Sequence, residues 1–206
     1  MAKTASSRKW LDRQHSDPYV KQAQREGYRS RAAYKLLEIQ EKDRILRPGI
    51  RVLDLGAAPG SWCQIAARLV GPRGSVVALD LLPMDPLPGV SILQGDFREP
   101  EMLERLCATL GGEPLDLVLS DMAPNITGMS VVDQPRAMYL VELSLELARL
   151  RLQPGGSLVV KVFQGTGFDE VLLELRQSFA RVVSRKPKSS RSQSRELYLV
   201  AKGFHP

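Results

Sequence analysis

A lysine stands in the middle of an apolar run in the last third of the chain. The run LVVKVF (158–163) has the length and composition of a buried strand, with Lys161 inside it. Lysine is almost never fully buried unless its ammonium group is paired. The sequence therefore predicts that Lys161 either makes a structural ion pair, for which Asp121 is the candidate partner, or takes part in catalysis.

Acidic residues follow several other apolar runs that are typical of strands. Asp80, Asp96 and Asp121 each lie at or just beyond the end of such a run, and open α/β sheets bind ligands beyond these ends. The loop GAAPG, from Gly56 to Gly60, follows the first run. Its two glycines permit a tight turn and a close approach of the backbone to a ligand.

The loop lacks the signatures of two common nucleotide sites. Ala58 stands where a dinucleotide loop has its second glycine, and no Gly-Lys-Ser/Thr sequence of a phosphate loop follows. Acids at successive strand ends suit a cofactor with a ribose, an adenine and a positive charge, which S-adenosylmethionine combines. A plain turn with solvated acids explains each feature alone, but the combination favours S-adenosylmethionine.

Alternating apolar and amphipathic segments predict the elements that position these residues. Strands are expected at 51–55, 75–80, 90–94, 115–121, 157–163, 180–186 and 196–203, and helices at 30–43, 61–70, 99–110, 132–152 and 168–179. This alternation predicts an α/β fold with a mostly parallel seven-stranded sheet and helices on both faces. The last two strands have no helix between them, so we expect an antiparallel pair.

Charge is unevenly distributed along the 206 residues, whose net charge is +6. Residues 1–50 carry 12 basic and 6 acidic groups (+6), residues 181–206 carry 7 and 1 (+6), and residues 51–180 carry 10 and 16 (−6). Basic flanks around an acidic centre favour a nucleic-acid partner, although basic ends also aid solubility. We expect a basic mobile tail over 1–28 and a single domain over 29–206.

Several classes of protein are disfavoured by composition. No apolar run is long enough to span a bilayer, and the first residues lack a secretory h-region, so we expect a cytoplasmic protein with no membrane contact. Cys63 and Cys107 form no redox or metal pattern, and His15 and His205 have no ligand-like partners nearby in sequence. We therefore expect free thiols and no metal site.

The motifs SRAAYKLLEIQ, DLGAAPGSW, LQGDF, SDMAPN, PGGSLVVKVFQG and RSQSRELYLVAKG resemble the bacterial FtsJ (RlmE) family over about residues 28–203. That resemblance implies a Rossmann-like class I methyltransferase, a monomer that uses S-adenosylmethionine. The implied substrate is the ribose 2′-hydroxyl of a uridine in the A-loop of 23S ribosomal RNA, within the large subunit. The residues that correspond to the family's catalytic tetrad are Lys35, Asp121, Lys161 and Glu196, and those of its cofactor site are Gly60, Trp62, Asp80, Asp96 and Asp121. Ser61 stands where the family has glycine.

The tetrad suits proton removal from a hydroxyl, which is a poor nucleophile until it is oriented and deprotonated. Burial and the nearby Lys35 favour a neutral Lys161 that acts as general base. Asp121 and Glu196 favour a charged Lys161 that stabilises a developing alkoxide, so both roles stay open. Spacing alone favours a solvated helix face for Lys35 and an edge-strand charge for Glu196.

The basic segments YRSR (28–31) and SRKPKSSRSQSR (184–195) bracket two tetrad residues and are expected to hold the RNA backbone. Arg185, Lys186 and Lys188 are the candidate contacts. Tyr19 and Tyr28 could stack on unpaired bases or pack locally. Two other functions remain open at this stage: an RNA-binding assembly factor with a vestigial cofactor fold, and a nicotinamide-dependent dehydrogenase.

Overall fold

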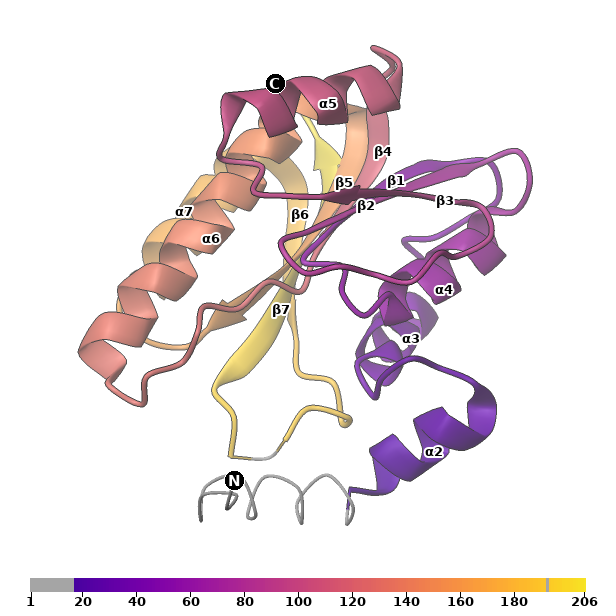
Figure 1. Cartoon of the computed structure of the whole chain (residues 1–206). Coiled ribbons are helices and arrows are strands. Elements are labelled where there is room, and N and C mark those ends of the chain that lie inside the picture. Colours follow the sequence, from indigo (N-terminus) through magenta and orange to yellow (C-terminus); the bar gives the residue numbers. More distant parts are fainter. Residues whose placement is uncertain (1–16, 192) are drawn as a thin grey trace.

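A seven-stranded sheet runs through the centre of the computed structural model, which describes residues 17–191 and 193–206 (Figure 1). The strands are β1 (Arg51–Leu55), β2 (Ser75–Asp80), β3 (Val90–Gln94), β4 (Leu115–Ser120), β5 (Leu152–Phe163), β6 (Phe179–Arg185) and β7 (Glu196–Phe204). Their spatial order is β3-β2-β1-β4-β5-β7-β6. Strands β1 to β5 pair in parallel, and β7 pairs antiparallel with both β5 and β6. The expected sheet is confirmed.

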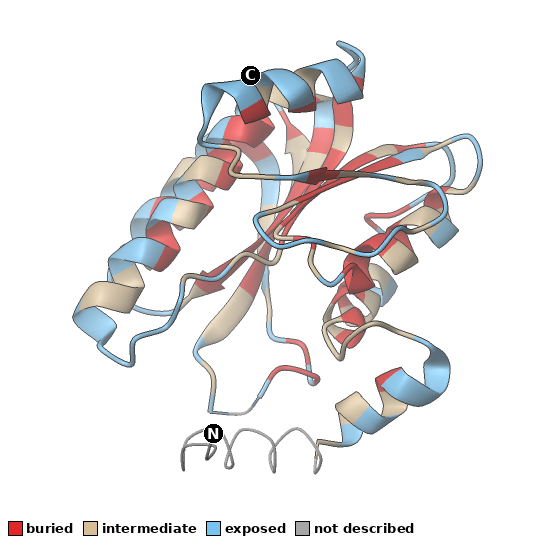
Figure 2. Cartoon of the chain, viewed as in Figure 1, coloured by how far each residue is buried: buried red, intermediate tan, exposed pale blue. Residues whose placement is uncertain are grey.

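Helices cover both faces of this sheet. They are α2 (Pro18–Glu26), α3 (Ala33–Asp43), α4 (Ser61–Val70), α5 (Pro100–Leu110), α6 (Ser130–Arg151) and α7 (Phe168–Ser178). One core, with Leu36 and Ile65, lies between α3, α4 and the sheet, and a second, with Leu106 and Leu145, lies under α5, α6 and α7. Buried residues follow the strands and the inner sides of the helices (Figure 2). The described ranges contain no helix long and apolar enough to cross a membrane.

The fifth strand is longer than the sequence predicts. The sequence PGG at 154–156 predicts a break before the strand, but β5 begins at Leu152, which pairs with Leu115. The register shifts between Leu115 and Leu117, and Gly155 takes a positive φ of 83°. A bulge therefore absorbs the glycines without ending the strand.

The helix expected from residue 30 begins instead at Ala33. Ser30 lies in the turn before it, where its Oγ accepts a hydrogen bond from the backbone N–H of Ala32. The same hydroxyl is 2.7 Å from the Oγ of Ser61, the first residue of α4. Ser30 thus joins the starts of two helices, and Ser61, the one departure from the family motif, supplies the other half of this contact.

Part of the expected tail is a helix packed on the domain. Asp17 caps α2 by accepting from the N–H of Tyr19 at 3.0 Å. The Tyr34 hydroxyl donates to Glu26 at 2.8 Å, and the rings of Tyr19 and Tyr28 pack against Tyr34 at 5.4 and 5.8 Å. Local packing therefore occupies both tyrosines, and the domain includes residues 17–28. Residues 1–16, with His15, lie outside the described residues.

Candidate active site

Lys161 and Asp121 meet at the carboxyl edge of the sheet. Strands β4 and β5 are parallel neighbours with Ser120 opposite Val160, so the residues that follow are also adjacent. Lys161 is 8% exposed, and its Nζ donates to the backbone oxygen of Asp121 at 2.6 Å and to its Oδ1 at 3.0 Å. The unusual lysine of the sequence is thus buried and paired with the expected carboxylate.

Lys35 and Glu196 complete the same cluster from opposite ends of the chain. Lys35 projects from α3, and its Nζ lies 2.8 Å from Oε1 of Glu196 and 4.0 Å from Oδ1 of Asp121. Glu196 is the first residue of β7, and its Oε1 also accepts from the hydroxyl of Ser190 at 2.7 Å. All four residues of the expected tetrad therefore lie together, in two linked ion pairs.

The two lysines keep both carboxylates charged. Burial alone raises the pKa of Asp121, but Lys161, and then Lys35 and the Tyr198 hydroxyl, outweigh it and hold that pKa below its ordinary value. Burial likewise raises the pKa of Glu196, whereas Lys35 and the Ser190 hydroxyl lower it to a net value below the ordinary one. At neutral pH the cluster therefore presents two carboxylates, each with a lysine beside it.

Tyr198 belongs to the site and was missed by the sequence reasoning. Its buried hydroxyl donates to Oδ1 of Asp121 at 2.6 Å, and Lys35 Nζ lies 5.6 Å from the centre of its ring. The available signal was its spacing, because residues two apart on a strand share a face and Tyr198 follows Glu196 by two. The buried hydroxyl of Tyr198 thus fixes the position of Oδ1 of Asp121.

A cleft of about 730 Å³ opens beside the tetrad, past the ends of β1, β2, β3 and β4. Among its lining residues are Gly56, Asp80, Asp96 and Asp121. A side chain at Gly56 would come within 2.7 Å of Met122, so glycine permits the close approach of this turn to the segment after β4. The cleft has the size of a small-molecule site and lies where open α/β sheets bind ligands.

Asp80 and Asp96 are held in different ways at the rim of this cleft. The Asp80 carboxylate accepts from the N–H of Ala58 at 2.9 Å and of Leu82 at 2.8 Å, and each oxygen retains a second lone pair. Asp96 is paired with Arg98, whose Nε lies 2.8 and 2.9 Å from its two oxygens, and that contact lowers the pKa of Asp96. Asp80 thus keeps free acceptor capacity at the rim of the cleft, as its predicted contact with a ribose requires.

Gly60 and Trp62 lie behind the turn and do not line this cleft. Gly60 takes a φ of 105° and is covered by Arg29, whose guanidinium donates to the Pro59 and Asp85 carbonyls. Trp62 is buried, donates from Nε1 to the Ala32 carbonyl, and packs on the ring of Tyr198. Trp62 lines, with Gly56 and Asp121, a smaller hollow on another side of the turn. The assignment of Gly60 and Trp62 to the cofactor site therefore stays a prediction.

Asp54 is a buried carboxyl that the sequence reasoning did not assign. The thiol of Cys63 donates to its Oδ2 at 3.0 Å, and its Oδ1 has no partner among the described residues. Burial raises the pKa of Asp54 to about 7. Cys63 is packed in the core, as a free thiol, and Cys107 is also free. The described residues contain no group of three or more potential metal ligands.

The family model described as FtsJ-like methyltransferase matches residues 28–204, which is most of the chain. The chain belongs to this family. A ribosomal RNA large subunit methyltransferase E from Alkalilimnicola ehrlichii is 62% identical over 198 residues, 96% of this chain and 95% of that protein. The protein of the same name from Pseudomonas aeruginosa is 56% identical and covers 99% of both chains.

Solved structures agree with the fold of this FtsJ-like methyltransferase. A ribosomal RNA methyltransferase from Plasmodium falciparum superposes with a TM-score of 0.77 at 33% identity, covering 86% of this chain and 98% of that one. Fibrillarin from Aeropyrum pernix, crystallised with natively bound S-adenosyl-L-methionine, gives a TM-score of 0.55 at 19% identity, over 82% and 75% of the two chains. The chain is an enzyme, a methyltransferase.

The basic flanks of this FtsJ-like methyltransferase divide into structural and exposed groups. Arg185 donates to both oxygens of the buried Asp43 at 2.8 and 2.7 Å, and Lys186 donates to the Ser194 and Glu196 carbonyls. These two side chains hold the fold together, so they are poor candidates for phosphate contacts. Lys188 and Arg191, which lie three positions apart in the same segment, are exposed.

Replacing Asp80 by alanine should weaken S-adenosylmethionine binding strongly. A hydrogen bond to a charged group contributes about 1.5–3 kcal/mol, so we expect Kd to rise about 10- to 150-fold. Calorimetric titration with the cofactor measures this directly. Lys161→Met is the matched variant, because its side chain faces Asp121 and its cofactor affinity should stay within a few fold of the wild type. An equal loss in both variants would remove the distinction between the two sites.

Proposed function

We propose that this FtsJ-like methyltransferase transfers the methyl group of S-adenosylmethionine to the ribose 2′-hydroxyl of a uridine in the A-loop of 23S ribosomal RNA, within the large ribosomal subunit. The two linked ion pairs of Lys161 with Asp121 and Lys35 with Glu196, beside the cofactor cleft, carry this proposal. The names of the relatives, which are ribosomal RNA methyltransferases, support the substrate class. The enzyme would act in the cytoplasm, where its substrate is found.

The chain's own residues supply the acid–base chemistry. Bound S-adenosylmethionine provides an electrophilic methyl group, and the enzyme must orient the hydroxyl and accept its proton. Lys161 Nζ donates two hydrogen bonds, to the backbone oxygen and to Oδ1 of Asp121. A neutral amine in this arrangement has its lone pair free to take the proton of the substrate. Asp121, held by Tyr198, fixes the direction of that lone pair.

Lys35 and Glu196 contribute charge and position in this proposal. Lys35 and Glu196 form an ion pair, and Lys35 also lies 4.0 Å from Asp121. Lys35 therefore adds positive potential next to Lys161, which must lose its proton in this proposal. The hydrogen bond from Ser190 to Glu196 anchors the pair to the segment before β7. A positive group here also stabilises the negative charge that develops on the acceptor oxygen.

Tritium transfer from labelled S-adenosylmethionine tests the proposed function. Large subunits and naked 23S RNA are compared as acceptors, with RNA that is already methylated at the acceptor position as the control. We expect label in the large subunits and, after nuclease digestion, in a 2′-O-methyluridine. Label on a base atom would contradict the proposed acceptor. A complete lack of transfer would favour a non-catalytic RNA-binding protein.

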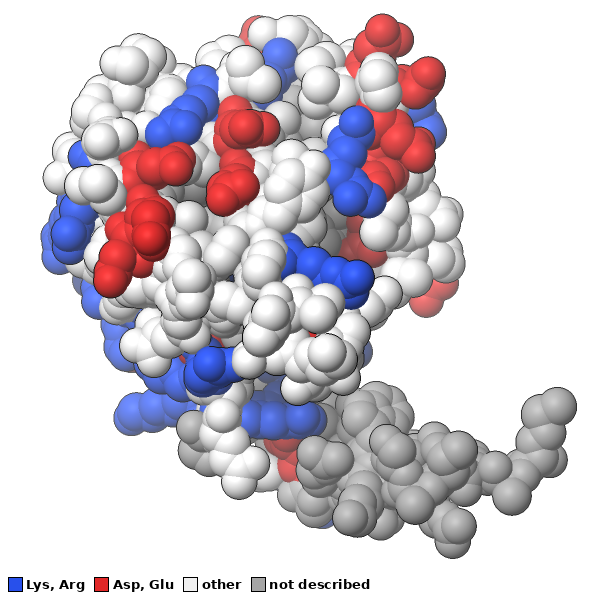
Figure 3. Space-filling model, turned by 90° about the vertical axis from the view of Figure 1, so that its left-hand side faces the viewer, with Lys and Arg blue, Asp and Glu red and all other residues white. Residues whose placement is uncertain are grey.

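Lys and Arg side chains line much of the lower edge of the face that Figure 3 shows, whereas its upper part carries acidic and basic side chains together. The segment 186–191 lies toward this end of the molecule (Figure 1), where Glu38 of α3 accepts from the N–H groups of Lys188 and Ser189. Arg31 donates to the Ser189 carbonyl from the other side. Hydrogen bonds from Glu38 and Arg31 thus hold the backbone of residues 188 and 189, and the exposed side chains of Lys188 and Arg191 project from this segment close to Glu196.

Removing these two charges should flatten the salt dependence of RNA binding. Each lost phosphate contact lowers the slope of log K against log salt by about 0.7–0.9, so Lys188→Ala with Arg191→Ala should reduce it by roughly 1.5. Filter binding across a salt series provides the slope. The control is Arg73→Ala with Arg105→Ala, which removes the same charge from exposed positions far along the chain. An equal reduction in both double variants would show a general charge effect only.

A further inference from the structure

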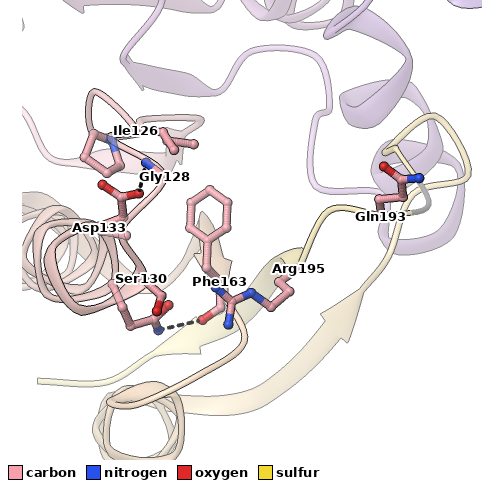
Figure 4. A pocket seen from close by; sticks show the side chains of 10 residues that line it. Ile126, Gly128, Ser130, Asp133, Phe163, Gln193 and Arg195 are labelled. Carbon is pink, nitrogen blue, oxygen red and sulfur yellow. Dashed lines mark hydrogen bonds between the residues drawn. The ribbon is translucent and has the colours of Figure 1, made fainter.

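A second hollow, of about 240 Å³, lies next to the tetrad and is separate from the cofactor cleft. Figure 4 shows the ring of Phe163 standing in it, with Ile126 and Asp133 on one side and Arg195 on the other. Pro124, a residue of the loop after β4, belongs to both this hollow and the cofactor cleft. The two spaces are therefore neighbours across one loop.

The chain ties this hollow directly to three tetrad residues. Phe163 follows Lys161 by two positions and lies opposite Glu196 in the β5–β7 register. Arg195 immediately precedes Glu196, and Pro124 follows Asp121 by three. The hollow is thus lined by residues that adjoin Lys161, Glu196 and Asp121 along the chain or across the sheet.

The chemical character of the hollow matches a flat, polar-edged ring. Phe163 offers a partly exposed aromatic face, and Arg195 is exposed, with no ion pair among the described residues. Asp133 is occupied, because its carboxylate accepts from the N–H groups of Thr127 and Gly128 and fixes the loop. The hollow therefore combines an aromatic face, a cation and a loop that is pinned in place, which is how unpaired RNA bases are held.

We propose that this hollow binds the base of the acceptor nucleotide, stacked on Phe163 and flanked by the guanidinium of Arg195. The proposal rests on the proposed function, since a base lies here only if its ribose is presented to Lys161. An enzyme that acts on a nucleotide in folded RNA takes it out of the stack and reads the exposed base by stacking and by its edge. The fixed loop from Pro124 to Gly128 forms the wall that receives it.

The amide of Gln134 adds a preference for one kind of base edge. Its Nε2 donates to the backbone oxygens of Phe163 at 3.1 Å and Thr166 at 3.0 Å, so both hydrogens are used and the orientation of the amide is set. Its Oε1 remains as an acceptor at the hollow. Uracil presents an N3–H donor on its Watson–Crick edge, and cytosine presents the N–H donors of its N4 amino group there. The hollow therefore favours a base edge that carries an N–H donor.

A double comparison of enzyme and substrate tests this site. Wild type, Phe163→Ala and Phe163→Tyr are assayed on large subunits carrying either a uridine or an abasic ribose at the acceptor position. Stacking of a base is worth about 5- to 150-fold when removed by alanine substitution, so Phe163→Ala should lower kcat/KM on uridine by that factor, chiefly through KM. Phe163→Tyr should restore it. On the abasic substrate, which wild type uses poorly, Phe163→Ala should cause no further loss.

The outcomes separate this inference from the proposed function. If wild type places no methyl group on the 2′-oxygen, the proposed function fails and this inference with it. If wild type methylates normally but Phe163→Ala lowers the rate equally on both substrates, or on neither, only the base site is overturned. Calorimetry with S-adenosylmethionine guards against misfolding, and a loss of cofactor binding in Phe163→Ala would also overturn the assignment. Leu173→Ala, an exposed apolar position on α7, is the control variant.

Discussion

Replacement of Lys161 by methionine should lower kcat by about 10²–10⁴-fold, the usual contribution of a positioned acid–base group. Methionine keeps the unbranched apolar stem in the buried strand but has no nitrogen to accept a proton. The rest of the cluster should survive, because Asp121 keeps its bond from Tyr198 and its contact with Lys35. Single-turnover methyl transfer on large subunits isolates the chemical step from release of the product.

Lys161→Arg distinguishes the two possible roles of Lys161. Arginine stays charged and cannot act as a base, so this variant should have little activity if Lys161 accepts the proton. A side chain that only stabilises the alkoxide by its charge would be replaced by arginine with substantial activity retained. Substantial activity in that variant would contradict the proton-transfer role.

A substrate with a single 2′-deoxy nucleotide at the acceptor position should bind with nearly unchanged affinity and accept no methyl group. Its phosphates remain available to Lys188 and Arg191, and its base remains available to Phe163, so the binding contacts are kept. The atom that the tetrad acts on is missing. Filter retention measures binding, and labelled S-adenosylmethionine measures transfer in the same sample.

Methylation of the 2′-deoxy substrate would be an equally clear result. Carbon methylation of a base needs a nucleophile that activates the ring, and both cysteines are unsuited to this. Cys63 is buried against Asp54, and Cys107 lies in α5, away from the tetrad. Methyl incorporation into the deoxy substrate would show that the acceptor is a base atom. The roles of Lys161 and Asp121 would then have to be withdrawn.

The strands and the Lys161–Asp121 pair could be read from sequence because both depend on local patterns. Apolar runs and their glycine-rich ends predict the strands, and the usual order of doubly wound sheets places the fourth strand beside the fifth. Asp121 and Lys161 each lie at or near the end of one such run, so the adjacency of β4 and β5 brings them together. Nothing beyond periodicity and topology is needed for that step.

Contacts that depend on strand register or on packing between distant segments could not be predicted from the sequence. The reach of Tyr198 to Asp121 requires the pairing of Lys161 with Tyr198 across β5 and β7, which the sequence does not specify. The pairing of Arg185 with Asp43 joins residues 142 positions apart. It removed Arg185 from the expected RNA-binding surface. Helix α2 was likewise hidden, because its partner Tyr34 lies in the next helix rather than within α2 itself.

The insertion of β7 between β5 and β6 makes this a site that is assembled late during synthesis of the chain. Glu196 and Tyr198 are contributed by the final strand, while Lys35 emerges long before it. A nascent chain that stops at Arg195 has the cofactor turn but leaves Lys35 without its carboxylate and the edge of β5 unpaired. An open strand edge invites pairing with other chains. Closure of the sheet and completion of the tetrad thus depend on the same strand.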